Sequence, residues 1–164
     1  MNNGALARSA GETIYSRFIP ADIVQSLFSE CKIRKIDAGV SLHGAETGKF
    51  WIEGCTVEDT VIIKKLLSEN LYFTIANDRL GMVMHKDATK AKAVIALAKY
   101  WGISQSEIVA FGDDLYDIDM LSYAGIGVAM ENALDEVKAA SNLVCMTNDN
   151  DGIAEWLKVN ICNN

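Results

Sequence analysis

The sequence predicts an α/β fold in two parts, an αββαββ unit with an antiparallel sheet and a following unit with a parallel sheet. The first observation is the order of periodicities between Pro20 and His85, which reads helix, strand, strand, helix, strand, strand. The second is the change after His85, where helical stretches alternate with short apolar runs, as in parallel sheets. We expect a hairpin segment over 1–19, the αββαββ unit over 20–86 and the parallel unit over 87–164.

Two short strands are predicted in the N-terminal segment, at residues 5–7 and 13–19, because a polar turn separates two apolar stretches. Pro20 suits the first turn of a helix, and apolar residues then recur at intervals of three and four. The predicted helices span 21–31 and 58–69, and the predicted strands span 32–42, 49–53, 71–76 and 81–85, with a tight turn at Asn77–Asp78. This order predicts a four-stranded antiparallel sheet with two helices on one face and polar side chains on the other.

The second part is predicted to alternate helices and buried strands up to the C-terminus. Its first helix is alanine-rich and ends at Gly102, a residue typical of helix ends. Asn132 is a good N-cap residue for the helix expected after it. The predicted helices span 91–101, 133–140 and 152–161, and the predicted strands span 108–111, 126–130 and 143–146, with one further helix-like stretch between the first two strands.

An acidic loop follows the first of these apolar strands. The strand ends at Gly112, and Asp113, Asp114 and Asp117 come directly after it. The carboxyl end of a buried parallel strand is where open α/β sheets place their ligands. Carboxylates there need a positive partner, and Mg²⁺ prefers oxygen ligands. A simple structural alternative is that Asp114 or Asp117 caps the following helix, and spacing alone leaves both interpretations open.

Composition excludes several classes of partner. The 164 residues carry a net charge of −7, which argues against nucleic acid or an anionic membrane surface as the main partner. No apolar run approaches the ~18 residues of a membrane span, and no secretory signal is visible. The four cysteines are far apart and form no C-x-x-C motif, so we expect reduced thiols in a cytoplasmic protein.

The segment from Thr89 to Leu157 resembles the C-terminal half of the haloacid dehalogenase (HAD) superfamily, specifically its Cof-like sugar-phosphate phosphatases. The αββαββ unit before it resembles the cap domain of the same subfamily, so the resemblance implies a Rossmann-like core with a cap. Ala91 stands where the family pattern has Gly, and Tyr116 where it has Asn. The matched motifs are Lys90, Gly102–Ile103, GDDLYD at 112–117, Met120–Leu121, Ala124–Gly125, Ala129–Met130, Asn132–Ala133 and Asn148 to Gly152.

The resemblance implies a Mg²⁺-dependent phosphatase acting on a small phosphorylated metabolite such as a sugar phosphate. Asp113 would be the metal ligand, and Asp117 would support the metal and its waters. Lys90 would neutralise the transferred phosphoryl group, and Asn132 would help to hold the loop or the phosphate. Without the resemblance, Lys90 reads as a solvated lysine in the first turn of a helix.

The nucleophilic aspartate of such phosphatases lies in a D-x-D-G-T motif, and the 164 residues contain none. We therefore expect a truncated, inactive chain that binds Mg²⁺ weakly. The strand at 108–111 would have an open edge, favouring self-association or membership of a longer protein. The alternative is a catalytically inactive binding or interaction module. Substrate specificity would come from the first unit, with His43, Trp51, Asn77 and Arg79 as candidates that the sequence does not separate.

Overall fold

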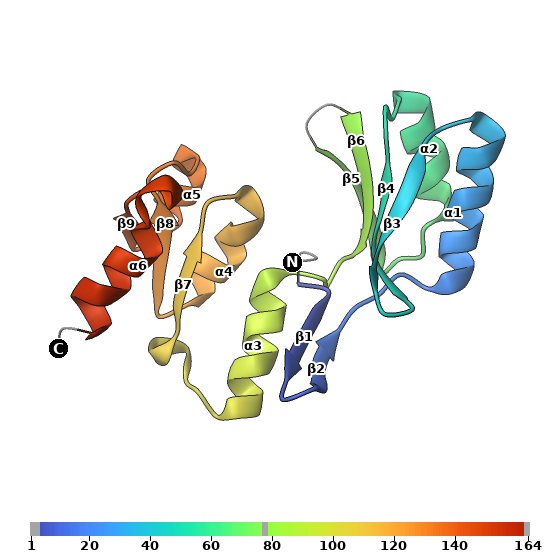
Figure 1. Cartoon of the computed structure of the whole chain (residues 1–164). Helices are drawn as coiled ribbons and strands as arrows, with labels where there is room; N and C mark the ends of the chain where they lie inside the picture. Colours follow the sequence, from blue (N-terminus) through green and yellow to red (C-terminus); the bar gives the residue numbers. More distant parts are fainter. Residues whose placement is uncertain (1–3, 77–78, 163–164) are drawn as a thin grey trace. The chain divides into compact units, whose positions relative to one another are not determined.

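The structure is a computed structural model that describes residues 4–76 and 79–162 (Figure 1). The chain divides into two compact units, Met1–Thr89 and Lys90–Asn164. The turn predicted at Asn77–Asp78 lies outside the described residues. Among the residues described, no helix is both long enough and apolar enough to cross a membrane.

The first unit opens with an antiparallel hairpin and continues as the predicted αββαββ order. The turn of the hairpin uses Ala10 and Gly11, both with positive φ. The elements are β1 (Leu6–Ser9), β2 (Glu12–Ser16), α1 (Ala21–Arg34), β3 (Ala38–His43), β4 (Glu46–Ile52), α2 (Val57–Leu66), β5 (Leu71–Ala76) and β6 (Leu80–His85).

The strands β3 to β6 form one antiparallel sheet in the order β3-β4-β6-β5. Both helices lie on the same face of this sheet (Figure 1), which confirms the predicted arrangement. Their buried side chains meet alternate residues of the strands, because successive strand residues point to opposite faces. The core contains Leu27 and Cys31 of α1, Ile63 of α2, and Phe50, Ile52, Phe73 and Val83 of the sheet.

Two predictions for this unit were wrong in detail. The strand expected from residue 32 begins only at Ala38, because α1 continues to Arg34 and ends at Lys35 in the left-handed conformation. Ile33, whose alternation with Ile36 suggested a strand, is 75% exposed on that helix. The helix-free face of the sheet is also not purely polar, since Met82 and Met84 are buried there. Their strand, β6, lies between two others and is apolar on both sides, as interior strands often are.

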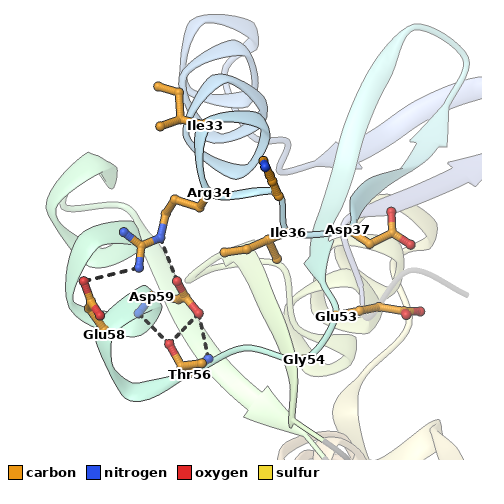
Figure 2. Close-up of a pocket in the computed structure, with 10 residues that line it drawn as sticks. Ile33, Arg34, Ile36, Asp37, Glu53, Gly54, Thr56, Glu58 and Asp59 are labelled. Atoms are coloured by element: carbon orange, nitrogen blue, oxygen red, sulfur yellow. Dashed lines mark hydrogen bonds and ion pairs between the residues drawn. The ribbon is translucent and has the colours of Figure 1, made fainter.

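A buried charge network holds the start of α2 to the end of α1. Arg34 Nε donates to Asp59 Oδ1 at 2.7 Å, and Asp59 Oδ2 accepts from the amide and hydroxyl of Thr56 at 2.9 and 2.5 Å. Figure 2 shows these contacts on one wall of an open pocket of about 680 Å³, with Asp37 and Glu53 on the other side. Burial alone would raise the pKa of Asp59, but the hydrogen bonds from Thr56 and Arg34 together lower it.

This lowered pKa predicts an acid-sensitive first unit. A carboxyl whose folded pKa lies below its unfolded value adds stability above that unfolded value, here 3.8, and loses it as pH falls through the folded pKa. We expect Asp59→Asn to reduce the free energy of unfolding at pH 7 and to reduce it much less at pH 2. Urea titrations of both proteins at the two pH values check this, and an equal difference at both would contradict it.

The second unit contains the predicted parallel sheet, in the order β7-β8-β9. One face packs Ala110 and Ala129 against α4 and α5, and the other packs Phe111 edge-on against Trp156 of α6, with ring centroids 5.3 Å apart. The elements are α3 (Lys90–Trp101), β7 (Val109–Gly112), α4 (Ile118–Tyr123), β8 (Ile126–Met130), α5 (Asp135–Ala139), β9 (Leu143–Cys145) and α6 (Gly152–Leu157), with short 3-10 turns between them.

The N-cap predicted at Asn132 was wrong. Helix α5 begins at Asp135, and Leu134 occupies the cap position without a side-chain hydrogen bond. Residues 130–133 instead form a turn, in which the amide of Ala133 donates to the carbonyl of Met130 at 3.0 Å. This turn displaces the start of the helix by two residues from the predicted position.

Candidate phosphate-binding and metal-binding site

The candidate site is built at the carboxyl end of β7, where the chain turns sharply at Gly112. A Cβ at this position would lie 2.5 Å from Cβ and 2.8 Å from Cγ of Asp117. Only glycine therefore lets the side chain of Asp117 fold back under the end of the strand. Asp117 becomes almost completely buried there, with 2% of its surface exposed.

The buried carboxylate of Asp117 closes the acidic loop. Its Oδ2 accepts from the backbone amides of Asp113 and Asp114, each at 3.2 Å. Its Oδ1 forms an ion pair with Nζ of Lys90, the first residue of α3. A buried carboxylate is tolerated when a cation and hydrogen-bond donors compensate for lost hydration, and this one has both.

These contacts resolve some of the alternatives left open by the sequence. Asp114 caps the 3-10 turn η3 (Leu115–Asp117), with its Oδ1 accepting from the amide of Tyr116 at 3.1 Å and Asp117 completing a capping box. Asp117 also stands at the N-cap position of α4, but its side chain makes no cap hydrogen bond to that helix. The solvated-lysine interpretation of Lys90 is wrong, since its side chain is only 22% exposed and is paired with Asp117. The supporting role of Asp117 toward a metal stays a prediction.

The side chains of Asp113 and Asp114 are exposed and that of Asp117 is buried, but Asp113 differs from both neighbours in the partners of its carboxylate. Its amide is fixed by Asp117, while no hydrogen bond or ion pair engages its carboxylate in the described part of the chain. A carboxylate that is positioned by its backbone but unpaired is suited to bind a cation.

Asn132 lies on the loop after β8, at the same edge of the parallel sheet as Asp113. The register pairs Gly112 with Ala129, so the two loops leave neighbouring strands at the same level. Asn132 Oδ1 accepts from the amide of Asn148 at 3.4 Å, which ties this loop to the one after β9. The amide nitrogen of Asn132 remains a donor at that edge.

The donor set fits Mg²⁺ only as a sparsely ligated ion. No group of three or more His, Cys, Asp or Glu side chains is placed to hold a metal among residues 4–76 and 79–162. Asp113 contributes one free carboxylate, and Mg²⁺ commonly keeps several waters beside one or two protein carboxylates. We therefore expect any Mg²⁺ at Asp113 to be bound weakly.

The ion pair between Lys90 and Asp117 is the feature that sequence reasoning missed. The two residues are 27 positions apart, so no local spacing links them. The remaining signal was Gly112 directly before the acidic residues, since a glycine at a strand end often marks a close approach of other atoms. Lys90, Asp113 and Asp117 are brought together, and Asn132 lies on the adjoining loop.

A buried Lys–Asp pair and a free aspartate at the carboxyl edge of a parallel sheet define an α/β protein with a candidate phosphate site. The sequence model of the haloacid dehalogenase-like hydrolases matches residues 55–157, more than half of the chain. The chain therefore belongs to the haloacid dehalogenase-like hydrolases, which confirms the resemblance described above.

Similar proteins of known sequence include several phosphatases. The 5-amino-6-(5-phospho-D-ribitylamino)uracil phosphatase YitU of Bacillus subtilis is 36% identical over 107 residues, 62% of this chain and 40% of that protein. The pyridoxal phosphate phosphatase YbhA of Escherichia coli is 45% identical over 69 residues, 42% of this chain and 25% of that protein. A Haemophilus influenzae protein named only as a candidate phosphatase is 44% identical over 100 residues, 59% of this chain and 38% of that protein. The matched part is thus well under half of each relative's length.

Solved structures share the fold over most of the chain. BT1666 of Bacteroides thetaiotaomicron, described as a phosphatase of the HAD superfamily, matches with a TM-score of 0.76 at 26% identity, over 96% of this chain and 71% of that chain. TM0651 of Thermotoga maritima matches with a TM-score of 0.82 at 21% identity, over 96% of this chain and 73% of that chain. The second likeness shows the fold alone.

Proposed function

We propose that this chain carries the phosphate-binding and Mg²⁺-binding part of a phosphatase that hydrolyses phosphomonoesters of small metabolites. The observation that carries the proposal is Lys90, held by the buried carboxylate of Asp117, which also accepts a hydrogen bond from the amide of Asp113. The family of the chain and its phosphatase relatives support the same reaction class.

The chemistry follows from the donors that remain. One ammonium N–H of Lys90 is used by Asp117, so two others are left to bind phosphoryl oxygens. A fixed positive charge at that place stabilises the charge spread over those oxygens during transfer. When bound at Asp113, Mg²⁺ would supply further neutralisation of the phosphate. Asn132 would add a neutral donor from the next loop.

Two substrate classes are consistent with the proposal. Sugar phosphates are the class implied by the resemblance to Cof-like phosphatases. The names of YitU and YbhA instead describe phosphomonoesters of small molecules that carry a heteroaromatic ring, a pyrimidine in one and a pyridine in the other. Both classes present the same phosphate to Lys90 and differ only in the remaining part of the molecule.

We propose a cytoplasmic location for this activity. All four cysteines are free, and Cys31, Cys55 and Cys145 are buried. Burial, with smaller effects from neighbouring groups, raises the pKa of Cys31 to about 11, so this thiol stays protonated at neutral pH. Buried, protonated thiols that form no disulfide are what a reducing compartment maintains.

The second candidate function is a catalytically inactive binding or interaction module, a homo-oligomer formed through the parallel sheet. The observation that favours it is the position of β7 at one edge of that sheet. The carbonyl of Ile108 accepts a hydrogen bond from the amide of Ile126, so Ile108 and every second residue after it form their backbone hydrogen bonds with β8. Val109 and Phe111 therefore direct their backbone N–H and C=O groups to the open edge. An apolar pocket of about 290 Å³, lined by Leu97, Trp101 and Val109 among others, adjoins this edge.

A phosphomonoester assay distinguishes the two functions. The printed sequence contains no D-x-D-G-T motif, so we expect these 164 residues alone to show no turnover of p-nitrophenyl phosphate with or without Mg²⁺. The variant Asp113→Ala lacks the proposed Mg²⁺ ligand, so its rate of hydrolysis serves as the background rate. Robust turnover that needs Mg²⁺ and disappears in Asp113→Ala would contradict this expectation and would place the complete reaction in this chain.

A further inference from the structure

Helix α2 presents two exposed valines on the side that faces away from the sheet. Its buried residues are Asp59 and Ile63, and Val57 and Val61 lie on the opposite side of the helix, since about 3.6 residues make one turn. The exposed fraction is 84% for Val57 and 51% for Val61. A spacing of four residues places the two valine side chains next to each other, in one stripe along the helix.

The first unit does not require valine at either position. Among the described residues of this unit, neither Val57 nor Val61 belongs to the hydrophobic core or packs against it. Valine is also a poorer helix former than the lysine or glutamate that is common at exposed helix positions, because its branched side chain loses rotamer freedom in a helix. An apolar stripe that the core leaves exposed is suited to contact another molecule, and the charges around it indicate which one.

The charges on this helix are ordered from one end to the other. Glu58 lies in the first turn, and Lys64 and Lys65 lie in the last. The side chain of Glu58 is 77% exposed, and its Oε1 lies 3.5 Å from a guanidinium nitrogen of Arg34 (Figure 2). No ion pair or hydrogen bond engages the ammonium groups of the two lysines in the described part of the chain. From its start to its end, the exposed side of α2 is therefore acidic, then apolar, then basic.

We propose that α2 is a contact surface for a second copy of this chain, and that the two helices pair antiparallel about a two-fold axis at Val61. A two-fold axis brings the same patch of both copies together. Val61 then meets Val61 of the second copy, and the acidic first turn of each helix lies beside the basic last turn of the other. The surface contains none of the residues assigned to phosphate or Mg²⁺, so the proposal does not depend on the proposed function.

The positions of the charges favour the antiparallel pair. Lys65 comes two helical turns after Glu58, so both side chains leave α2 on the same side. In the antiparallel pair, Glu58 of each copy faces Lys65 of the other, and Val57 packs on the aliphatic stem of that lysine. A parallel pair would place Glu58 beside Glu58 and Lys65 beside Lys65, and these like charges repel each other. With about 15 Å of helix in contact, we expect a reversible dimer with a dissociation constant on the order of 0.1–1 mM.

Sedimentation equilibrium of the 164-residue chain, from about 20 µM to 1 mM, measures this association. We expect Glu58→Lys and Lys65→Glu each to weaken the dimer about tenfold or more, because each variant alone brings like charges together. An equimolar mixture of the two variants restores opposite charges at both contacts, so it should dimerise with an affinity within about threefold of that of the wild type.

Two further variants separate the contact from the charge and from the fold. Val61→Asp keeps Glu58 and Lys65 but places two carboxylates on the axis, so it should also leave the chain monomeric. Lys99→Glu makes the same change of charge as Lys65→Glu at an exposed position of α3, and it should leave the dimer unchanged. A urea titration of each variant distinguishes loss of the dimer from loss of the fold of the first unit.

Three results would overturn the proposal. The first is a monomer over the whole concentration range. The second is a dimer that Glu58→Lys, Lys65→Glu and Val61→Asp all leave unchanged, which would place the contact elsewhere, as at the edge of β7. The third is a mixture of the two charge variants that stays monomeric, since opposite charges at α2 would then not hold the copies together.

Discussion

Asp117→Ala is expected to destabilise the second unit by about 3–5 kcal/mol, the usual loss when one partner of a buried ion pair is removed. The substitution leaves the ammonium of Lys90 without its buried partner and the amides of Asp113 and Asp114 without their acceptor. Asp117→Asn retains an acceptor for the amides but removes the charge, so its effect should be intermediate. Urea titrations that follow the indole signals of Trp51 and Trp156 report the two units separately.

The matched control for this prediction is Asp119→Ala, which removes an exposed carboxylate two residues away on α4. Its effect should stay within about 0.5 kcal/mol, as for most surface substitutions. A loss from Asp117→Ala as small as that from Asp119→Ala would mean that the buried pair contributes nothing to the fold of the loop.

Gly112→Ala is the second substitution with a large expected effect. Its Cβ would lie 2.5 Å from Cβ of Asp117, and the carboxylate of Asp117 is held by Lys90 and two amides. Overpacking of this kind costs about 1–3 kcal/mol. Because relief of the clash requires Asp117 to move, the same substitution should also weaken phosphate binding at Lys90.

A double-mutant cycle separates this clash from a general effect of alanine at the strand end. In an Asp117→Gly background, the atoms that meet the new Cβ are absent, so the added cost of Gly112→Ala should largely disappear. Strictly additive effects in the free energy of unfolding would show that the close approach at Gly112 is not what requires glycine.

Local pattern predicted the fold and the place of the site. The order of periodicities predicted both sheets, and the apolar run ending before Asp113 predicted that the acidic loop lies at the carboxyl end of a parallel strand. Long-range pairing was beyond such reasoning. Nothing near Lys90 or Asp117 in the sequence indicates that they meet, because their contact depends on how α3 packs beside the loop.

The errors have the same origin. The alternation of Ile33 and Ile36 suggested a strand, but Ile33 lies on helix α1 and its side chain is exposed to solvent. Polar side chains were expected opposite the helices, yet β6 reads as a continuous apolar run, and its two methionines are buried. In both cases the burial of a side chain depends on which distant residues pack against it, and the periodicity of the local sequence carries no information about those residues.

The most direct test of the account is the binding of inorganic phosphate in the presence of Mg²⁺, measured by calorimetry for the wild type, Lys90→Gln and Lys99→Gln. Lys99 lies on the same helix as Lys90 but in its last turn, so its variant matches the change in charge. A hydrogen bond to a charged group contributes about 1.5–3 kcal/mol, so Lys90→Gln should weaken phosphate binding roughly tenfold or more. Lys99→Gln should leave it unchanged. Equal affinity in all three proteins would contradict the assignment of Lys90 as the phosphate-binding residue.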